Sequence, residues 1–299
     1  MLWIIDGLIY AFFTALYTLV NQHQYINGYV LGIWRGFGIA FIIAPCLFFV
    51  DELPDFHNWL LLIFQGVLIG IYDSHIFFAS ARFGANSTSR FLVLSILLTT
   101  IIWWLLTPKQ FLILFENATV FITLILCLAG FCICYWYMLN SKISKRAFFY
   151  MLPATIALAL MSVTTKEIAV MKQNVWFNII YYLTVSTFIS GLYNLFMLIL
   201  TKPETKSCYK MITEKKVIRI GVYIIGFSVV LIAAKTLALR MAPNPGYVIT
   251  LLLTTPLFVF MLSSDSDYKH NFEQKSGWGM MFFLCLIMLL VNSDLGIVD

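Results

Sequence analysis

Long apolar runs are the feature that most constrains how this chain folds. Charged residues, prolines and asparagine clusters bound ten such runs, at 3–20, 28–50, 59–80, 87–106, 117–139, 148–170, 176–200, 219–240, 246–264 and 277–294. About 20 apolar residues make one helical crossing of a lipid bilayer. Charged residues make up 11% of the chain, whereas about 25% are charged in an ordinary soluble domain. The sequence therefore excludes a soluble enzyme and predicts an integral, multi-pass membrane protein.

The continuity of these runs indicates helices rather than a barrel. Every backbone polar group in lipid must be paired inside the protein, which a helix achieves within one segment. A transmembrane barrel would show alternating segments of about ten residues instead. We therefore predict an all-α membrane protein with about ten transmembrane helices, joined by connections too short to hold a soluble domain.

The two halves of the chain share a layout. Leu97-Leu98-Thr99-Thr100 recurs as Leu252-Leu253-Thr254-Thr255, about half of the 299-residue chain later. Each tetrapeptide follows a helix and a short polar connection. Many transporters are built from inverted repeats of this kind. Because five is an odd number of crossings, the sequence predicts two inverted five-helix repeats, at 1–140 and 141–299.

Several classes of function lack their signatures. The formal net charge of +5 is spread thinly and forms no polybasic tail, so we expect no nucleic-acid partner. The sequence has no His-Glu-x-x-His, Gly-x-Ser-x-Gly, P-loop or paired-Asp motif, and we expect neither an enzyme nor a cofactor. Most of the cysteines fall inside apolar runs, where a thiol packs as a small hydrophobe, so we expect no metal site.

Asp73 is the sharpest candidate for a functional residue. It lies well inside the third apolar run, and a charge inside a membrane is costly enough to be a functional candidate by default. Gly66, Gly70, Phe77 and Ser80 recur with it at helical spacing on one face, and we expect Phe77 and Ser80 to be further substrate-binding residues. The small residues would let neighbouring helices approach and turn the carboxylate inward. A structural ion pair with another helix is the alternative interpretation.

Three basic residues also lie inside apolar runs. Lys235, in the eighth run, would bind a substrate carboxylate or phosphate, or pair with Asp73; extension of its ammonium to the membrane surface is the alternative. Lys166 and Arg35 are secondary candidates, in the sixth and second runs. For Arg35 we favour structural anchoring over substrate binding. Neutral polar contacts are expected from Asn194 and Tyr247, with interhelical hydrogen bonding as the alternative.

The layout and several short motifs resemble the drug/metabolite transporter superfamily, in its EamA-like ten-helix branch. The residues that carry the resemblance are Trp34-Arg35-Gly36-Phe37, the segment from Phe77 to Phe83, the two repeated tetrapeptides, Leu237-Ala238-Leu239 and Leu253 to Leu257. The resemblance implies two five-helix repeats of opposite topology and a central cavity lined by the third, fourth, eighth and ninth helices. It further implies export or exchange of small metabolites, such as amino acids or nucleotide derivatives.

The two indications of orientation differ. Most basic residues lie in the odd-numbered connections, which by the positive-inside rule places both termini outside the cell. The family usually places both termini in the cytoplasm. We expect an integral, multi-pass protein of a bacterial inner membrane, and we leave its orientation open.

The predicted function is that of a carrier. It would move a small polar or amphipathic metabolite by rocking two repeats around a site near the bilayer midplane, with Asp73 and Lys235 as the charged pair of that site. Expected partners are the substrate, membrane lipids and protons as a coupling ion, and the protein would act as a monomer or homodimer. The alternative is a membrane-embedded enzyme or flippase that binds a lipid-linked substrate through the basic segment 201–219.

Overall fold

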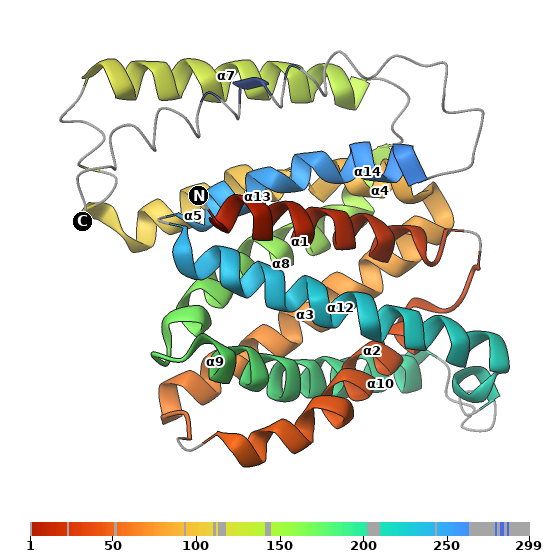
Figure 1. The fold of residues 1–299 in the computed structure, drawn as a ribbon. Helices are drawn as coiled ribbons and strands as arrows, with labels where there is room; N and C mark the ends of the chain where they lie inside the picture. The colour runs from red at the N-terminus through yellow and green to blue at the C-terminus, as the bar shows by residue number, and fades with distance from the viewer. Residues whose placement is uncertain are drawn as a thin grey trace.

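The computed structural model describes residues 2–22, 24–50, 53–92, 94–109, 112, 118–140, 145–201, 210–242, 244–262, 279, 282, 283 and 286. Within these ranges every regular element is a helix (Figure 1). The all-α prediction is therefore confirmed for the part of the chain that the structure describes.

Six helical segments in the described ranges are long and apolar enough to cross a membrane. They match the first, second, third, sixth, seventh and eighth apolar runs. In chain order they are α1 (Leu2–Leu19), α2 (Gly28–Ile43) with the 3₁₀ helix η1 (Ala44–Phe49), α3 (Phe56–Phe83), α8 (Lys145–Val170), the continuous segment α9 (Val175–Tyr181), η2 (Tyr182–Ser186) and α10 (Thr187–Thr201), and α12 (Lys215–Met241). These segments give the described part of the chain the features of an all-helical, multi-pass membrane protein.

The remaining apolar runs contain shorter or interrupted elements. The fourth run corresponds to α4 (Ala85–Leu92) and α5 (Leu94–Leu106), and the fifth to α7 (Ala118–Asn140). The ninth run consists of α13 (Pro245–Thr250), the 3₁₀ helix η3 (Leu251–Thr254) and α14 (Thr255–Leu262). The predicted tenth helix, 277–294, lies outside the described residues apart from 279, 282, 283 and 286. The total of ten helices therefore stays a prediction.

Asparagine and aspartate side chains fix where four helices begin. Each accepts a hydrogen bond from a backbone N–H of the first turn, which would otherwise lack a partner. The pairs are Asn27 with Tyr29 N at 2.9 Å, Asp55 with Asn58 N at 2.8 Å, Asn174 with Trp176 N at 3.0 Å and Asn244 with Gly246 N at 2.7 Å. The polar residues that bound the apolar runs thus start α2, α3, α9 and α13.

Two pairs of helices pack antiparallel, and each pair joins one helix from each half of the chain. α1 packs on α12, and α8 packs on α3. On α1 and α12, Tyr10 lies next to Lys235 and Phe13 next to Phe227. On α3 and α8, Gln65 contacts Thr165 and His75 contacts Tyr150. In Figure 1, α1 lies directly above α12, with α13 and α14 on its other side.

Glycines allow two further pairs to pack in parallel. α12 packs on α2, and α10 packs on α3. A Cβ added at Gly221 of α12 would lie 2.8 Å from Trp34 Cγ, and one added at Gly66 of α3 would lie 2.6 Å from Ile189 Cβ. These distances are too short for any side chain, so glycine is required for the close approach. α2 and α10 also pack on each other, with Gly36 against the backbone of Gly191.

Candidate functional site

Charged side chains are buried at three positions of the described structure. These residues are Arg35 on α2, Asp73 on α3 and Lys235 on α12, with exposed fractions of 3%, 0% and 2%. Burying a charge away from water costs several kcal/mol unless it is paired and hydrogen-bonded. The partners of these three groups therefore define the candidate site.

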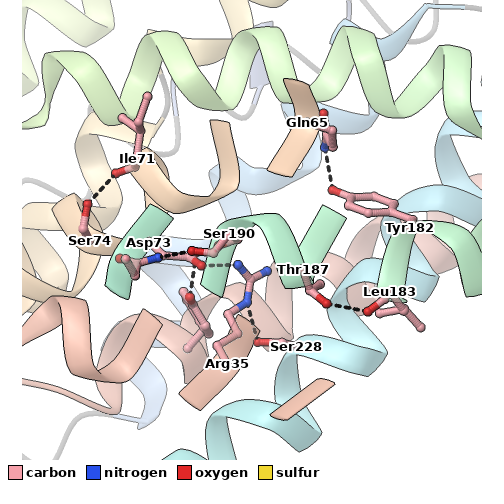
Figure 2. Close-up of polar contacts among 12 residues, drawn as sticks. Arg35, Gln65, Ile71, Asp73, Ser74, Tyr182, Leu183, Thr187, Ser190 and Ser228 are labelled. Atoms are coloured by element: carbon pink, nitrogen blue, oxygen red, sulfur yellow. Dashed lines mark hydrogen bonds and ion pairs between the residues drawn. The ribbon is translucent and has the colours of Figure 1, made fainter. Parts of the chain in front are cut away.

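Arg35 and Asp73 form the centre of a hydrogen-bonded network that joins four helices. Arg35 Nη1 forms an ion pair with Asp73 Oδ2, and Arg35 Nε donates to Ser228 Oγ of α12 at 3.0 Å (Figure 2). The Tyr17 hydroxyl of α1 donates to Asp73 Oδ1 at 2.7 Å. The Arg35 guanidinium also lies 5.3 Å from the centre of the Tyr17 ring, within cation–π range. Both carboxylate oxygens are thus occupied by partners within the protein.

The predicted pairing of Asp73 with Lys235 is wrong. The acid is paired with Arg35, which enters between α3 and α12 because α2 packs on both helices. Lys235 lies seven residues beyond Ser228 on α12, about 10 Å further along the helix axis. Arg35 therefore has the structural contact that we favoured for it. Its partner is Asp73, the acid that we expected to contact the substrate.

Lys235 has no hydrogen-bond partner for its Nζ among the described residues. The ammonium lies 5.8 Å from the centre of the Tyr10 ring on α1, close enough for a cation–π contact. A ring face compensates only part of the cost of burying an ammonium. Lys235 is consequently the buried charged group, among the described residues, whose hydrogen-bonding capacity is unused.

Lys166 is removed from the site by its hydrogen bonds. Its ammonium donates to the carbonyl oxygens of Leu239 at 2.8 Å, Arg240 at 3.2 Å and Ala242 at 2.6 Å. These carbonyls are at the C-terminal end of α12, where the last turn lacks intrahelical donors and favours a cation. The geometry makes Lys166 a capping residue.

Arg240 caps α8 in return, which the sequence did not lead us to expect. Its guanidinium donates to the carbonyl oxygens of Ala169 and Lys172, both at 3.3 Å, and of Gln173 at 2.5 Å. The C-terminal ends of α8 and α12 therefore lie side by side and cap each other. A basic residue in the last turn of a predicted helix was the available signal.

A second buried network, centred on Gln65 of α3, was also missed. Gln65 Nε2 donates to Tyr182 Oη at 2.6 Å and to Thr165 Oγ1 at 2.9 Å, while its Oε1 accepts from Thr164 Oγ1. Tyr182 begins the π-helical stretch η2 of the seventh apolar run, a type of distortion that is frequent at functional sites. An amide inside an apolar run was the sequence signal.

Two predicted residues of α3 lie on the buried face that carries Asp73. The Phe77 ring packs on the Tyr17 ring with centres 4.7 Å apart, so it supports the residue that binds the acid. Ser80 donates to the carbonyl oxygen of Phe77 at 3.1 Å. The structure brings Phe77 to the network, whereas the Ser80 hydroxyl is used within its own helix.

Asn194 and Tyr247 are both buried, in α10 and α13. Asn194 Nδ2 donates to the Ser190 carbonyl oxygen at 2.9 Å, and its amide lies against Gly32 of α2, where an added Cβ would be 2.4 Å from Asn194 Cγ. Its Oδ1 and the Ser190 hydroxyl have no partner in the described ranges. Ser190 is seen beside the Arg35 network in Figure 2. Asn194 therefore stays a candidate for substrate binding. The described structure gives no contact of Tyr247 that bears on the same prediction for that residue.

The site offers binding chemistry. It combines one internally neutralised ion pair, one ammonium without a hydrogen-bond partner in the described structure and two tyrosine rings. Within the described residues, no group of three or more His, Cys, Asp or Glu side chains is arranged to hold a metal ion. A scan against protein-family models and a search of curated proteins each found no match to this chain.

Proposed function

We propose that this chain is a multi-pass membrane carrier for a small metabolite, working by alternating access around the Arg35–Asp73 network. The observation that carries the proposal is the composition of this network. A buried ion pair is tied by hydrogen bonds to α1, α2, α3 and α12, and α12 comes from the other half of the chain. Ionisable groups placed deep among membrane helices are expensive, and they typically mark transport pathways.

The packing of helices from one half of the chain against helices of the other half supports two repeats that move against each other. α1 pairs with α12 as α8 pairs with α3, and α2 pairs with α12 as α10 pairs with α3. If α1, α2 and α3 correspond to α8, α10 and α12, each of these contacts is the counterpart of another under a two-fold operation. The long helices also fall at the same three places in each half. This is the arrangement expected of inverted repeats, and it supports the proposed relation to the EamA-like transporters.

The interrupted helix of the ninth run fits the same proposal. Substrate sites of transporters are typically formed where membrane helices are discontinuous. The 3₁₀ stretch η3 interrupts the helix between α13 and α14, and it packs on α1. Leu251 of η3 lies against Gly7, and Thr255 Oγ1 donates to the Ala11 carbonyl oxygen at 3.2 Å. The interruption therefore reaches the turn of α1 that carries Tyr10.

The experiment is uptake by purified protein in liposomes that are offered a mixed pool of amino acids, nucleosides, organic acids and phosphorylated metabolites. Mixed insertion makes the assay independent of orientation. Paired liposomes carry Asp73→Asn, and a second set carries Glu167→Gln, which replaces an exposed acid on α8.

The proposal expects uptake of one compound class by the wild-type protein and by Glu167→Gln, and its loss in Asp73→Asn. No flux of any soluble compound by folded protein would contradict the carrier proposal. That result would favour the alternative of an enzyme or flippase with a lipid-linked substrate.

A further inference from the structure

The buried charges of the candidate site do not cancel. Among the described residues, the buried charged side chains are Arg35, Asp73 and Lys235, which leaves one positive charge in excess when all three are ionised. Arg35 and Asp73 neutralise each other. The excess charge is therefore located at Lys235, and the cost of holding it there falls when an anion binds.

The surroundings of Lys235 define which group can bind. Ser228, seven residues earlier on α12, already accepts a hydrogen bond from Arg35. Both carboxylate oxygens of Asp73 already bind Tyr17 or Arg35. The adjacent Tyr10 presents its ring to the ammonium. The nearest turns of α12 contribute the buried apolar residues Leu231, Ile232, Ala234, Ala238 and Leu239. The setting thus combines one free cation with aromatic and aliphatic surface.

We propose that the carried substrate is a monoanion, a monocarboxylate with an uncharged and largely apolar body, whose carboxylate binds the Lys235 ammonium. This inference rests on the proposed carrier function and specifies its substrate class. One carboxylate brings the buried charge of the site to zero. Lysine provides three donors on a compact charge, all of which are free of hydrogen bonds to the described residues.

The same charge balance disfavours the amino acids that the family resemblance implied as substrates. A zwitterion brings an ammonium as well as a carboxylate, and the acid that would bind this ammonium is already held by Arg35 and Tyr17. A second cation near Lys235 would be unpaired and repelled. A phosphate monoester dianion has the opposite fault, because it would leave one negative charge in excess.

The test compares substrates that share a carbon skeleton and differ at one group. The three pairs are pyruvate with alanine, 4-methyl-2-oxopentanoate with leucine, and phenylpyruvate with phenylalanine. Each 2-oxo acid is a monoanion at pH 7, and each amino acid is a zwitterion. Radiolabelled uptake is measured in liposomes containing wild-type protein, Lys235→Met or Lys216→Met. Lys216 is exposed on the same helix and serves as the matched control.

We expect at least one oxo acid to enter wild-type and Lys216→Met liposomes at least tenfold faster than its amino acid. We expect Lys235→Met to lose that uptake. Amino acid uptake that equals or exceeds oxo acid uptake would overturn the inference and leave the carrier proposal standing. Oxo acid uptake that survives Lys235→Met would overturn it as well.

Absence of flux in both series would also overturn the monocarboxylate assignment, while the broader solute pool decides the carrier proposal separately. Thermal unfolding provides a check on folding. The oxo acid that enters fastest should raise the unfolding temperature of the wild-type protein and leave that of Lys235→Met unchanged. An equal rise in both proteins would contradict binding at Lys235.

Discussion

Arg35 of α2 and Asp73 of α3 form a buried ion pair whose other contacts lie on α1 and α12. The pair therefore fixes the position of four helices relative to one another. Its two charges satisfy each other, so the pair leaves the neighbouring Lys235 as the group available to a ligand. We thus assign stability to the Arg35–Asp73 pair and binding to Lys235, which lies further along α12 and forms no hydrogen bond with the described residues.

Neutralising the acid of this pair should destabilise the protein. Asp73→Asn leaves Arg35 as an uncompensated buried cation, a change that typically costs about 3–5 kcal/mol. We expect a clearly lower unfolding temperature for the purified protein in detergent. Glu167→Gln, at an exposed position of α8, should leave this temperature unchanged. Equal unfolding temperatures for Asp73→Asn and wild type would show that the pair does not hold the helices together.

Neutralising Lys235 should have the opposite effect on stability. Methionine has a similar length and needs no partner. Replacing a whole buried ion pair by apolar residues is often neutral or stabilising by about 1–4 kcal/mol, and Lys235 has no hydrogen-bond partner among the described residues that its loss would leave unpaired. Lys235→Met should therefore unfold at the same or a higher temperature than wild type in the absence of ligand, although it loses transport. A large drop in unfolding temperature would indicate that Lys235 has a structural partner and would argue against its role as a free binding group.

The Gln65 network should behave as one unit. Gln65→Leu removes the amide that binds Tyr182, Thr164 and Thr165. Both threonine hydroxyls keep their bonds to carbonyl oxygens of α8, so the main loss is the short bond to the buried Tyr182 hydroxyl, at about 1–3 kcal/mol. Tyr182→Phe should cost less, since it removes one member. Because the residues share bonds, the double substitution should cost less than the sum of the two single ones. Additive losses in thermal unfolding would refute the coupling.

Reciprocal capping predicts a coupled loss at one end of α8 and α12. Lys166→Met removes the ammonium that caps the end of α12. Arg240→Met removes the guanidinium from the end of α8, where Asn178 Nδ2 still donates to the carbonyl oxygens of Ala169 and Lys172. Each loss should cost about 0.3–2 kcal/mol. In limited proteolysis, the connection 171–174 should then be cleaved faster in each of the two variants than in the wild-type protein. Lys216→Met, at an exposed site of α12, is the control. If both variants are cleaved at the wild-type rate, Lys166 and Arg240 do not stabilise the ends of α12 and α8.

Apolar periodicity predicted the elements more reliably than their contacts. The long runs and their polar boundaries are enough to locate α1, α2, α3, α8 and α12, because burial in lipid demands helices of a fixed minimum length. Asp73 was identifiable for a similar reason, since a charge inside such a run stands out. The partner of Asp73 was not, because a sequence shows the face of a helix and not which neighbour packs on it.

Two residues show where the chemistry of a single position was insufficient. Lys166 has the sequence features of an intramembrane binding residue, and its capping role depends on where α12 ends beside it. Gln65 is neutral, so its sequence signal is weaker than that of a charged residue, although it joins α3 to α8 and to the π-helical stretch η2. Tertiary packing assigned both roles.

Counterflow tests the central claim most directly. Liposomes with the purified protein are preloaded with an unlabelled solute from the class that the uptake pool identifies, and they are diluted into a trace of the labelled compound. A carrier that alternates around one site predicts a transient accumulation of label above equilibrium, present in wild-type and Lys216→Met liposomes and absent in Lys235→Met. Label entry that is indifferent to the internal solute, or an overshoot that persists in Lys235→Met, would contradict the account.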